Sequence, residues 1–437
     1  MKYKASDYNI CQNISKDIYL CSNFFRSAHI LLSEKKYKLF TNATDPTSLL
    51  SVDPKLVNDL VKGGFIIPDE MNELEIYLNN QKKAQIDNSY LHIVVNPTLD
   101  CNLNCWYCYE NKVPHSTISQ EVLEGIKKYI SDQYQEISFN TLKITFFGGE
   151  PFLKPQAITD LVEFSEQFCK HNNLRLLLDF TTNGTLITDR ILNLLSNKSC
   201  VFQITLDGDR ERHNKIKYSI HKQFDTYSKV IKTLHDIQHF IPDSKIYVRI
   251  NFDNETLKGF KSIFESLLTL DKSKCCIIIK KVWQVNSDEI AKEDILNVLS
   301  LLFQAGFEVD FYSQGGLCFA DRNNQVTINF DGNVFKCTTI PKFADEYILG
   351  KLDCKTGKIS WLQDRVDYLQ NDSINPRCQK CRMLPSCGGP CRKKTETLKS
   401  DFCFLDSICM TEEEFALTQF QIELAKTTQP SNNIIVK

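Results

Sequence analysis

The sequence lacks three features that mark large classes of proteins. No apolar run approaches the roughly 20 residues that a membrane-spanning helix needs, and the N-terminus lacks the apolar core of a signal peptide. Excess charge of one sign is also missing, because 52 Lys and Arg stand against 54 Asp and Glu. These absences argue against a membrane protein, a secreted protein and a general nucleic-acid binder. We therefore expect a soluble, cytoplasmic protein.

Cysteine, by contrast, is abundant, with 18 residues in a chain of 437. Disulfides are rare in a reducing compartment. Metal or cluster ligation therefore explains tight groups of cysteines better than disulfides do. One such group lies near residue 100 and a second spans residues 318–409. Two or three domains can form from a chain of this length and ordinary composition.

Apolar strand-like runs alternate with amphipathic helical stretches between residue 91 and about residue 311. The expected strands are Leu91–Val95, Leu142–Phe147, Leu174–Phe180, Val201–Leu206, Ile246–Ile250 and Cys276–Ile279. The expected helices cover 119–133, 155–171, 188–197, 222–239, 256–269 and 288–304. Six β/α units predict an α/β fold, a parallel sheet covered by helices. Chemistry in such folds gathers at the C-terminal ends of the strands.

Two further domains are predicted around this sheet. Short strands at Ile18–Leu20 and Ala28–Leu32, a possible third at Tyr37–Phe40, and later helices indicate a winged-helix-like module over residues 1–86. The region 87–312 contains the β/α units. Residues 313–437 show short strands, turns and cysteines with little conventional core, so bound clusters are expected to stabilise them.

The first cysteine group is Cys101, Cys105 and Cys108, with CxxxCxxC spacing. Chance would place cysteines at these offsets about 0.03 times in a chain of this composition. The triplet follows the first strand of the β/α series. Three thiolates complete neither a tetrahedral zinc site nor a fully ligated cubane, so one iron stays open for a substrate or cofactor. The alternative is a structural zinc site with a distant fourth ligand.

This loop, with aromatic Tyr107 before its last cysteine, resembles the hallmark of the radical S-adenosylmethionine (radical SAM) superfamily. The resemblance implies a partial (β/α)6 TIM-like barrel. It also implies a [4Fe–4S] cluster whose open iron is chelated by SAM. Electron transfer from a low-potential cluster would cleave SAM and release a 5′-deoxyadenosyl radical. A flavodoxin- or ferredoxin-type donor would supply the electrons.

Further motifs follow the order of this superfamily. Gly148, Gly149, Glu150 and Pro151 resemble its GGEP segment, which holds the SAM amino group, and glycines let the backbone approach a ligand closely. Alone, these four residues would be a mere turn.

Three later residues are the other expected SAM contacts. Asn183 lies in a segment that resembles the family's TNG motif. Thr205 keeps the hydroxyl of the family's Ser-Leu-Asp-Gly motif. Arg249 is placed to offer a guanidinium to the SAM carboxylate, with a surface ion pair as the alternative.

The second cysteine group resembles the SPASM extension of one branch of the superfamily. That extension binds two auxiliary [4Fe–4S] clusters. The resemblance implies that the nearer cluster is held by Cys318, Cys337 and Cys391, and the outer one by Cys378, Cys381, Cys387 and Cys409. Cys354 is a candidate for the missing fourth ligand, and Cys403 competes with Cys409. A zinc ribbon is the alternative for Cys378 and Cys381.

The SPASM branch mostly modifies peptides and proteins. The N-terminal module resembles domains that bind the leader of a ribosomally made peptide by adding it as a strand to a sheet edge. The resemblance therefore implies an oxidoreductase that matures a precursor peptide. It would install a thioether, carbon–carbon or ether crosslink.

Several alternatives stay open. The enzyme could oxidise a residue of a folded sulfatase or act on a small molecule. Thr338-Thr339 follows Cys337 where sulfatase-maturing relatives have an aspartate base, which counts against the first. A protein of another class would be an iron–sulfur redox sensor or electron carrier without SAM chemistry. The N-terminal module could bind DNA or be purely structural. No catalytic acid or base is identified.

Overall fold

A large sheet with helices along one face is the main feature of the fold. The computed structural model describes residues 2–43, 45–110, 112–219, 224–282, 284, 291–312, 317–339, 343–369, 375–389, 391 and 403–427. The chain divides into two units. The sheet unit comprises residues 85–311 and 319–371, and the terminal unit comprises residues 1–84, 312–318 and 372–437.

The strands of the sheet unit follow the order β12-β11-β10-β9-β8-β7-β6-β13-β14-β15-β16 among the described residues. Neighbours from β12 to β13 pair in parallel, and β13 to β16 pair antiparallel. The strands are β6 (Tyr90–Asn96), β7 (Thr141–Phe146), β8 (Arg175–Thr182), β9 (Cys200–Thr205), β10 (Ser244–Phe252), β11 (Cys275–Lys281), β12 (Glu308–Asp310), β13 (Gln325–Asn329), β14 (Asn333–Phe335), β15 (Gly350–Leu352) and β16 (Ile359–Trp361). The six predicted strands and the parallel sheet are confirmed.

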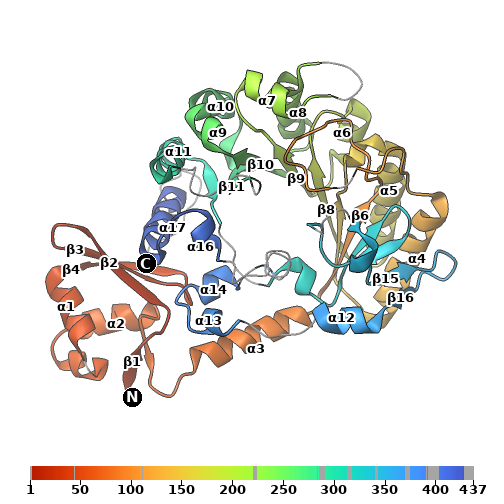
Figure 1. The fold of residues 1–437 in the computed structure, drawn as a ribbon. Coiled ribbons are helices and arrows are strands. Elements are labelled where there is room, and N and C mark those ends of the chain that lie inside the picture. The colour runs from red at the N-terminus through yellow and green to blue at the C-terminus, as the bar shows by residue number, and fades with distance from the viewer. Residues whose placement is uncertain are drawn as a thin grey trace. The chain divides into compact units, whose positions relative to one another are not determined.

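Helices connect successive parallel strands and lie on the outer side of the sheet (Figure 1). They are α4 (Gln120–Ile137), α5 (Pro155–His171), α6 (Asp189–Leu195), α7 (Arg210–Ile216), α8 (Thr226–Phe240), α9 (Asn254–Lys258), α10 (Phe260–Leu267) and α11 (Lys292–Gln304). Helix α12 (Gln363–Leu369) follows the antiparallel strands. Short 3-10 turns are η2 (Pro151–Leu153), η3 (Lys272–Lys274), η5 (Phe319–Asp321) and η7 (Asp345–Tyr347). The sequence does not predict α7, and residues 288–290 of the expected last helix lie outside the described residues. Within the described part of the chain, no helix is long and apolar enough to span a bilayer.

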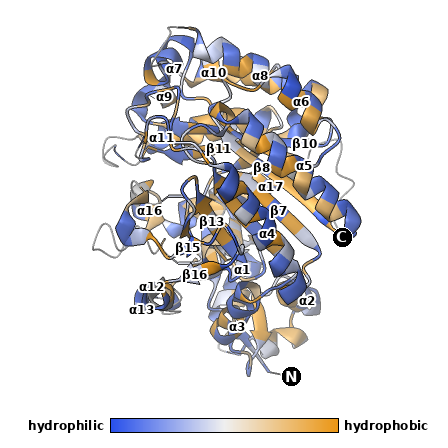
Figure 2. Cartoon of the chain, turned by 90° about the vertical axis from the view of Figure 1, so that its right-hand side faces the viewer, coloured by the Kyte–Doolittle hydropathy of each residue, from blue (hydrophilic) through white to orange (hydrophobic). Residues whose placement is uncertain are grey.

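Burial differs among the parallel strands. Strands β7, β9 and β10 alternate buried and half-buried residues, whereas β6, β11 and β13 are buried almost throughout, as in a sheet covered on both faces. On the buried face, Phe180 stacks between Phe146 and Phe202, with centroid distances of 5.2 and 5.0 Å. Figure 2 shows predominantly hydrophobic strands beside helices of mixed hydropathy. Thr205 and Arg249, which are neighbours in register, belong to the half-buried set.

The terminal unit contains segments from both ends of the chain. Its strands are β1 (Tyr3–Ala5), paired with β5 (Ile66–Pro68), and β2 (Asn9–Ser15), β3 (Ile18–Asn23) and β4 (Ala28–Ser33), which form an antiparallel sheet in that order. Its helices are α1 (Glu34–Asn42), η1 (Pro46–Ser51), α2 (Pro54–Lys62), α3 (Glu73–Gln85), α13 (Pro376–Gln379), α14 (Leu384–Cys387), α16 (Phe404–Ser407) and α17 (Glu412–Thr427). Helix α17 packs against β2 and β3, and the Gln12 amide donates to the Glu413 carbonyl.

The third N-terminal strand predicted over Tyr37–Phe40 is wrong, because these residues lie in α1. The Ser33 hydroxyl accepts the Lys36 N–H at 3.4 Å and caps the helix. Glu34 pairs with Lys38 one turn later. The apolar residues Tyr37 and Phe40 stand three apart, a spacing that places them on the same face of a helix.

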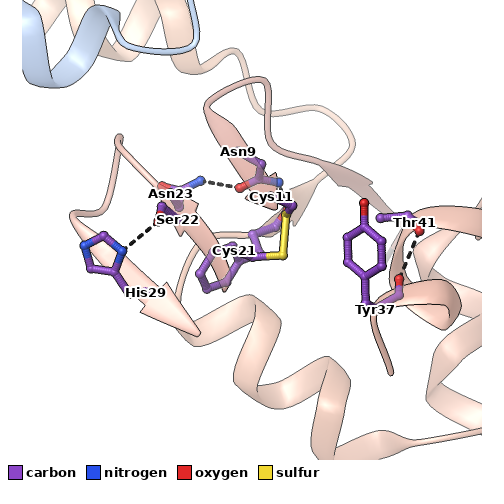
Figure 3. Close-up of a disulfide and its surroundings, with 9 residues drawn as sticks. Asn9, Cys11, Cys21, Ser22, Asn23, His29, Tyr37 and Thr41 are labelled. Atoms are coloured by element: carbon purple, nitrogen blue, oxygen red, sulfur yellow. Dashed lines mark hydrogen bonds between the residues drawn. A yellow bond between two sulfur atoms is a disulfide. The ribbon is translucent and has the colours of Figure 1, made fainter. Parts of the chain in front are cut away.

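Cys11 and Cys21 face each other across β2 and β3 and form a disulfide, with a Cα–Cα distance of 4.1 Å (Figure 3). Cys21 is fully buried in a core that also includes Leu32, Phe40 and Leu60. The sequence argument gives these two cysteines no role, because it favours clusters over disulfides. Only the register between the strands brings the two thiols together.

Candidate active site

The cysteine triplet lies on the long loop between β6 and α4. The first residues of this loop are tied to its end: the Thr98 hydroxyl donates to the Ser116 carbonyl at 2.7 Å. Asp100 accepts the N–H groups of Cys101 and His115 at 2.8 and 2.9 Å. These hydrogen bonds therefore fix the start of the loop, at Cys101, against its end.

Hydrogen-bond donors from later strands and loops reach two of the three thiols. The Asn183 amide donates to the Cys101 sulfur at 3.9 Å, and the Lys217 ammonium to the Cys105 sulfur at 4.0 Å. Cys101 and Cys105 are half-buried, while Cys108 is exposed. Burial, followed by the nearby Glu150, raises the pKa of Cys101 to about 12. Without a metal the thiol form is favoured, and iron binding would release the proton.

The two glycines after β7 let that segment pack against the cysteine loop. A Cβ on Gly148 would lie 2.3 Å from the Thr98 carbonyl oxygen, and one on Gly149 2.2 Å from the Asp100 oxygen. Because neither residue has a Cβ, the two segments can approach closely, and the Gly149 N–H donates to the Thr98 carbonyl oxygen at 3.1 Å. Both contacts are to backbone atoms, which cannot move aside. The glycines are thus required by the neighbouring loop, a reason that the motif alone does not show.

Glu150 is a fully buried carboxylate that links this segment to the end of β8. It accepts the Thr182 hydroxyl at 2.8 Å and the N–H groups of Asn183 and Phe152 at 2.8 and 3.0 Å. Burial raises its pKa to about 7, although these hydrogen bonds oppose the rise. Pro151 is buried at the start of η2. Glu150 therefore holds Asn183, which in turn contacts Cys101.

Thr205 and Arg249 lie at the ends of β9 and β10, on the half-buried face. The Arg249 Nε donates to the Asn251 side chain at 2.8 Å. No ion pair of Arg249 is found among the described residues, so the structure does not support the surface ion pair considered above.

A buried ion pair that the sequence argument missed lies beside the triplet. Lys217 is 3.4 Å from Asp207, and their side chains are 5% and 0% exposed. The Tyr107 hydroxyl donates to Asp207, which also accepts the Asn251 N–H at 3.0 Å. Burial opposes the charged form of Lys217, but Cys105, Tyr107 and Asp207 outweigh it and hold its pKa well above the usual range.

Asp207 had a signal in the sequence, because it follows Thr205 in the Thr-Leu-Asp-Gly segment. Lys217 had none, since it is 112 residues from Cys105 and lies in an ordinary polar stretch. Its position after α7, a helix that was not predicted, explains the omission.

His213 belongs to the same network and is fully buried. Its Nδ1 accepts the Asp207 N–H at 3.2 Å, and its Nε2 has no partner among the described residues. Burial, followed by the positive charge of Lys217, lowers the pKa of His213 to about 3. The imidazole is therefore neutral at physiological pH.

Acidification is expected to weaken the fold through His213. The folded pKa lies below the unfolded value, so the contribution to stability is complete above pH 6.5 and is lost as the pH falls toward 3. Between pH 7 and pH 5 the loss amounts to about 2 kcal/mol. Urea unfolding of the wild type and of His213→Gln at pH 7 and at pH 5 measures this loss of stability, because the glutamine side chain does not titrate. An equal pH dependence of the two proteins would contradict the assignment.

The later cysteines are distributed over both units. Cys337, in the sheet unit, packs with Leu99 and Val113 of the loop that carries the triplet. The other six expected cluster ligands, Cys318, Cys378, Cys381, Cys387, Cys391 and Cys409, belong to the terminal unit. Burial raises the pKa of Cys387 to about 12, and the charges of Cys403, Cys378 and Cys381 add to the rise.

A family model described as the radical SAM superfamily matches residues 95–267. This chain carries a radical SAM domain. The cysteine-type anaerobic sulfatase-maturating enzyme of Clostridium perfringens is 24% identical in an alignment of 386 positions that covers 79% of this chain and 99% of that protein.

Two solved structures share the fold. One, described as native anSMEcpe with bound AdoMet and Cp18Cys peptide, has a TM-score of 0.60 and 20% identity, covering 78% of this chain and all of the other. The second is Streptococcus suis SuiB bound to precursor peptide SuiA, with a TM-score of 0.50 and 14% identity, covering 94% of this chain and all of SuiB.

Radical SAM enzymes use a [4Fe–4S] cluster and SAM, which together supply a 5′-deoxyadenosyl radical. The residues around the triplet fit such a group, because three thiols meet an amide and an ammonium donor at the open face of the sheet. Within the described residues, no three His, Cys, Asp or Glu side chains are grouped so that they could hold a single metal ion. Cubane ligands bind separate irons, so that arrangement is not required here.

Proposed function

We propose that this radical SAM protein matures a ribosomally made precursor peptide by installing an intramolecular crosslink. Cys101, Cys105 and Cys108 would hold the cluster that binds SAM. The seven later cysteines would hold two auxiliary clusters. In the net reaction the peptide loses two hydrogens: one goes as an atom to the adenosyl group, and the other leaves as a proton and an electron to an auxiliary cluster.

The share of the chain that each relative covers is the observation that carries the peptide assignment. The sulfatase-maturating relative is matched almost completely by 79% of this chain, which leaves about a fifth of the chain without a counterpart. SuiB, solved with its precursor peptide, covers 94%. The extra length therefore supports a peptide-capturing enzyme with a separate recognition module.

The residues near the triplet suggest how SAM is oriented. Lys217 and Arg249 are two cations near the triplet among the described residues, and either ammonium or guanidinium suits the SAM carboxylate. Asp207 fixes Lys217 by an ion pair, while Asn251 holds the guanidinium of Arg249. The chain thus offers two preset cations beside the thiols. Tyr107 would keep Cys105 and Asp207 in place between them.

The sheet β2-β3-β4 offers an edge for a peptide leader. Strand β4 ends this sheet, and no further strand pairs with it among the described residues. Leu31 on β4 is 51% exposed, although His29 on the same strand contacts Glu423 of α17. Peptides commonly bind to proteins by adding a strand to an exposed sheet edge. We assign leader binding to β4.

Oxidation of a sulfatase residue is the second candidate, because a sulfatase-maturating enzyme is among the curated relatives. The aspartate that follows a cluster cysteine in such enzymes is replaced here by Thr338. This replacement removes the base of that reaction. The peptide crosslink is therefore the better-supported function.

Anaerobic incubation with SAM, a strong reductant and short peptides encoded beside the gene tests the proposal. We expect a peptide product that is two hydrogens lighter, and its mass spectrum would locate the bond. Leu31→Lys is expected to reduce this product while 5′-deoxyadenosine formation continues, because the leader edge is altered and the triplet is not. Unchanged peptide masses, or oxidation of a cysteine-containing sulfatase peptide instead, would contradict the proposal.

A further inference from the structure

Tyr77 on α3 connects the N-terminal module to the cysteine-rich segment of the same unit. Its ring packs in one apolar cluster with Tyr8 and Leu384, and Cys378 lies against that cluster. Tyr8 in turn stacks on Phe25, with ring centroids 5.6 Å apart. Helix α3 therefore shares a core with residues that were expected to carry the outer cluster.

The Tyr77 hydroxyl is buried and has no hydrogen-bond partner among the described residues. The side chain is only 5% exposed, so the hydroxyl is shielded from bulk solvent. Such a group is costly, and native proteins rarely keep one without a reason. A phenylalanine would fill the same space without this penalty. The hydroxyl thus points to an acceptor that is missing among the described residues.

Two of the expected outer-cluster ligands lie close to Tyr77. Cys378 packs against the apolar cluster that contains Tyr77, and Cys387 ends α14, the short helix that begins at Leu384 of the same cluster. A phenol is protonated at neutral pH and can donate a hydrogen bond. A backbone donor already contacts the same set of cysteines, since the Met383 N–H reaches the Cys381 sulfur at 3.4 Å.

We propose that the Tyr77 hydroxyl donates a hydrogen bond to a sulfur of the iron–sulfur cluster held by Cys378, Cys381 and Cys387. This inference rests on the outer cluster assigned under the proposed function. A cluster sulfide or a cluster-bound cysteinate would supply the hydrogen-bond acceptor that the Tyr77 hydroxyl lacks. Tyr77 is then a positioning residue supplied by the N-terminal module, not a ligand.

The hydrogen bond has an electrochemical consequence. A donor to a cluster sulfur stabilises the reduced cluster, which carries more negative charge, and so raises its potential. Because the donor is on α3, the folded N-terminal module contributes to the electron affinity of the outer cluster. A change in the position of α3 would alter that affinity.

Tyr77→Phe in the full chain tests the inference, because it removes only the hydroxyl. Replacing Cys101, Cys105 and Cys108, and also Cys318 and Cys337, by alanine first removes the signals of the SAM cluster and of the nearer auxiliary cluster. At a fixed potential, EPR should show the ratio of reduced to oxidised outer cluster fall roughly three- to tenfold. Tyr227→Phe is the matched control, because it also removes a buried hydroxyl, one bonded to Ser266 at 2.6 Å. It should leave the ratio unchanged.

Iron and sulfide analysis separates the two possible failures. Unchanged cluster content with an unchanged ratio in Tyr77→Phe overturns the hydrogen bond and leaves the proposed function intact. Full iron content in Cys378→Ala/Cys381→Ala shows that no outer cluster exists and overturns both. If Tyr77→Phe fails to fold, 3-fluorotyrosine at position 77 replaces it as a stronger donor. The ratio should then rise, and no rise counts against the inference.

Discussion

Cys105→Ala is expected to abolish the formation of 5′-deoxyadenosine from SAM. Three thiolates leave one iron of a cubane open, and losing a further ligand leaves two irons without protein support. The Lys217 ammonium would also lose the sulfur that it contacts at 4.0 Å. We expect about four iron atoms fewer per chain and turnover at the background level. Iron analysis and chromatography of the nucleoside products measure both effects.

Cys169→Ala is the matched control for this experiment. Cys169 is buried on α5, is 3% exposed, and belongs to neither cysteine group. Its loss removes a small apolar contact and should leave cluster content and SAM cleavage intact. Undiminished 5′-deoxyadenosine release from Cys105→Ala would rule out the radical mechanism at this triplet. Absence of 5′-deoxyadenosine from the wild-type reaction would favour an electron carrier or redox sensor.

Glu150→Ala is expected to cause the largest loss of stability among single substitutions near the site. The change leaves the Thr182 hydroxyl and the N–H groups of Asn183 and Phe152 buried without their acceptor. Unsatisfied buried donors of this kind should cost about 3–5 kcal/mol in total. Asn183 would also lose its orientation toward Cys101. SAM binding should weaken at least about tenfold.

Urea unfolding and anaerobic equilibrium dialysis of SAM measure the two effects of Glu150→Ala. Glu150→Gln keeps the shape and one acceptor oxygen, so it should fall between alanine and the wild type. Glu163→Ala, on the exposed face of α5, is the control and should change stability by less than about 0.5 kcal/mol. A wild-type SAM affinity in Glu150→Ala would show that this carboxylate does not organise the site.

The central fold was predictable because its signals are local. Each strand of the β/α series is an apolar run of suitable length, and helical periodicity separates one run from the next. The error at Tyr37–Phe40 has a related origin, since four residues with two apolar positions fit a strand or a helix equally well. Capping by Ser33 decided in favour of the helix. The missed helix α7 is short and mostly polar, so it gave no periodic signal.

The cysteine spacing by itself placed three thiols on one loop, and the resemblance of that loop to radical SAM proteins implied the chemistry. The tertiary structure decided which groups stand around those thiols. Lys217 reaches Cys105 across 112 residues, and Cys11 meets Cys21 only through strand register. The unpaired hydroxyl of Tyr77 is likewise recognisable only once its burial is known. Spacing along a chain encodes ligands on one loop, whereas contacts between distant residues arise only when the strands and helices pack.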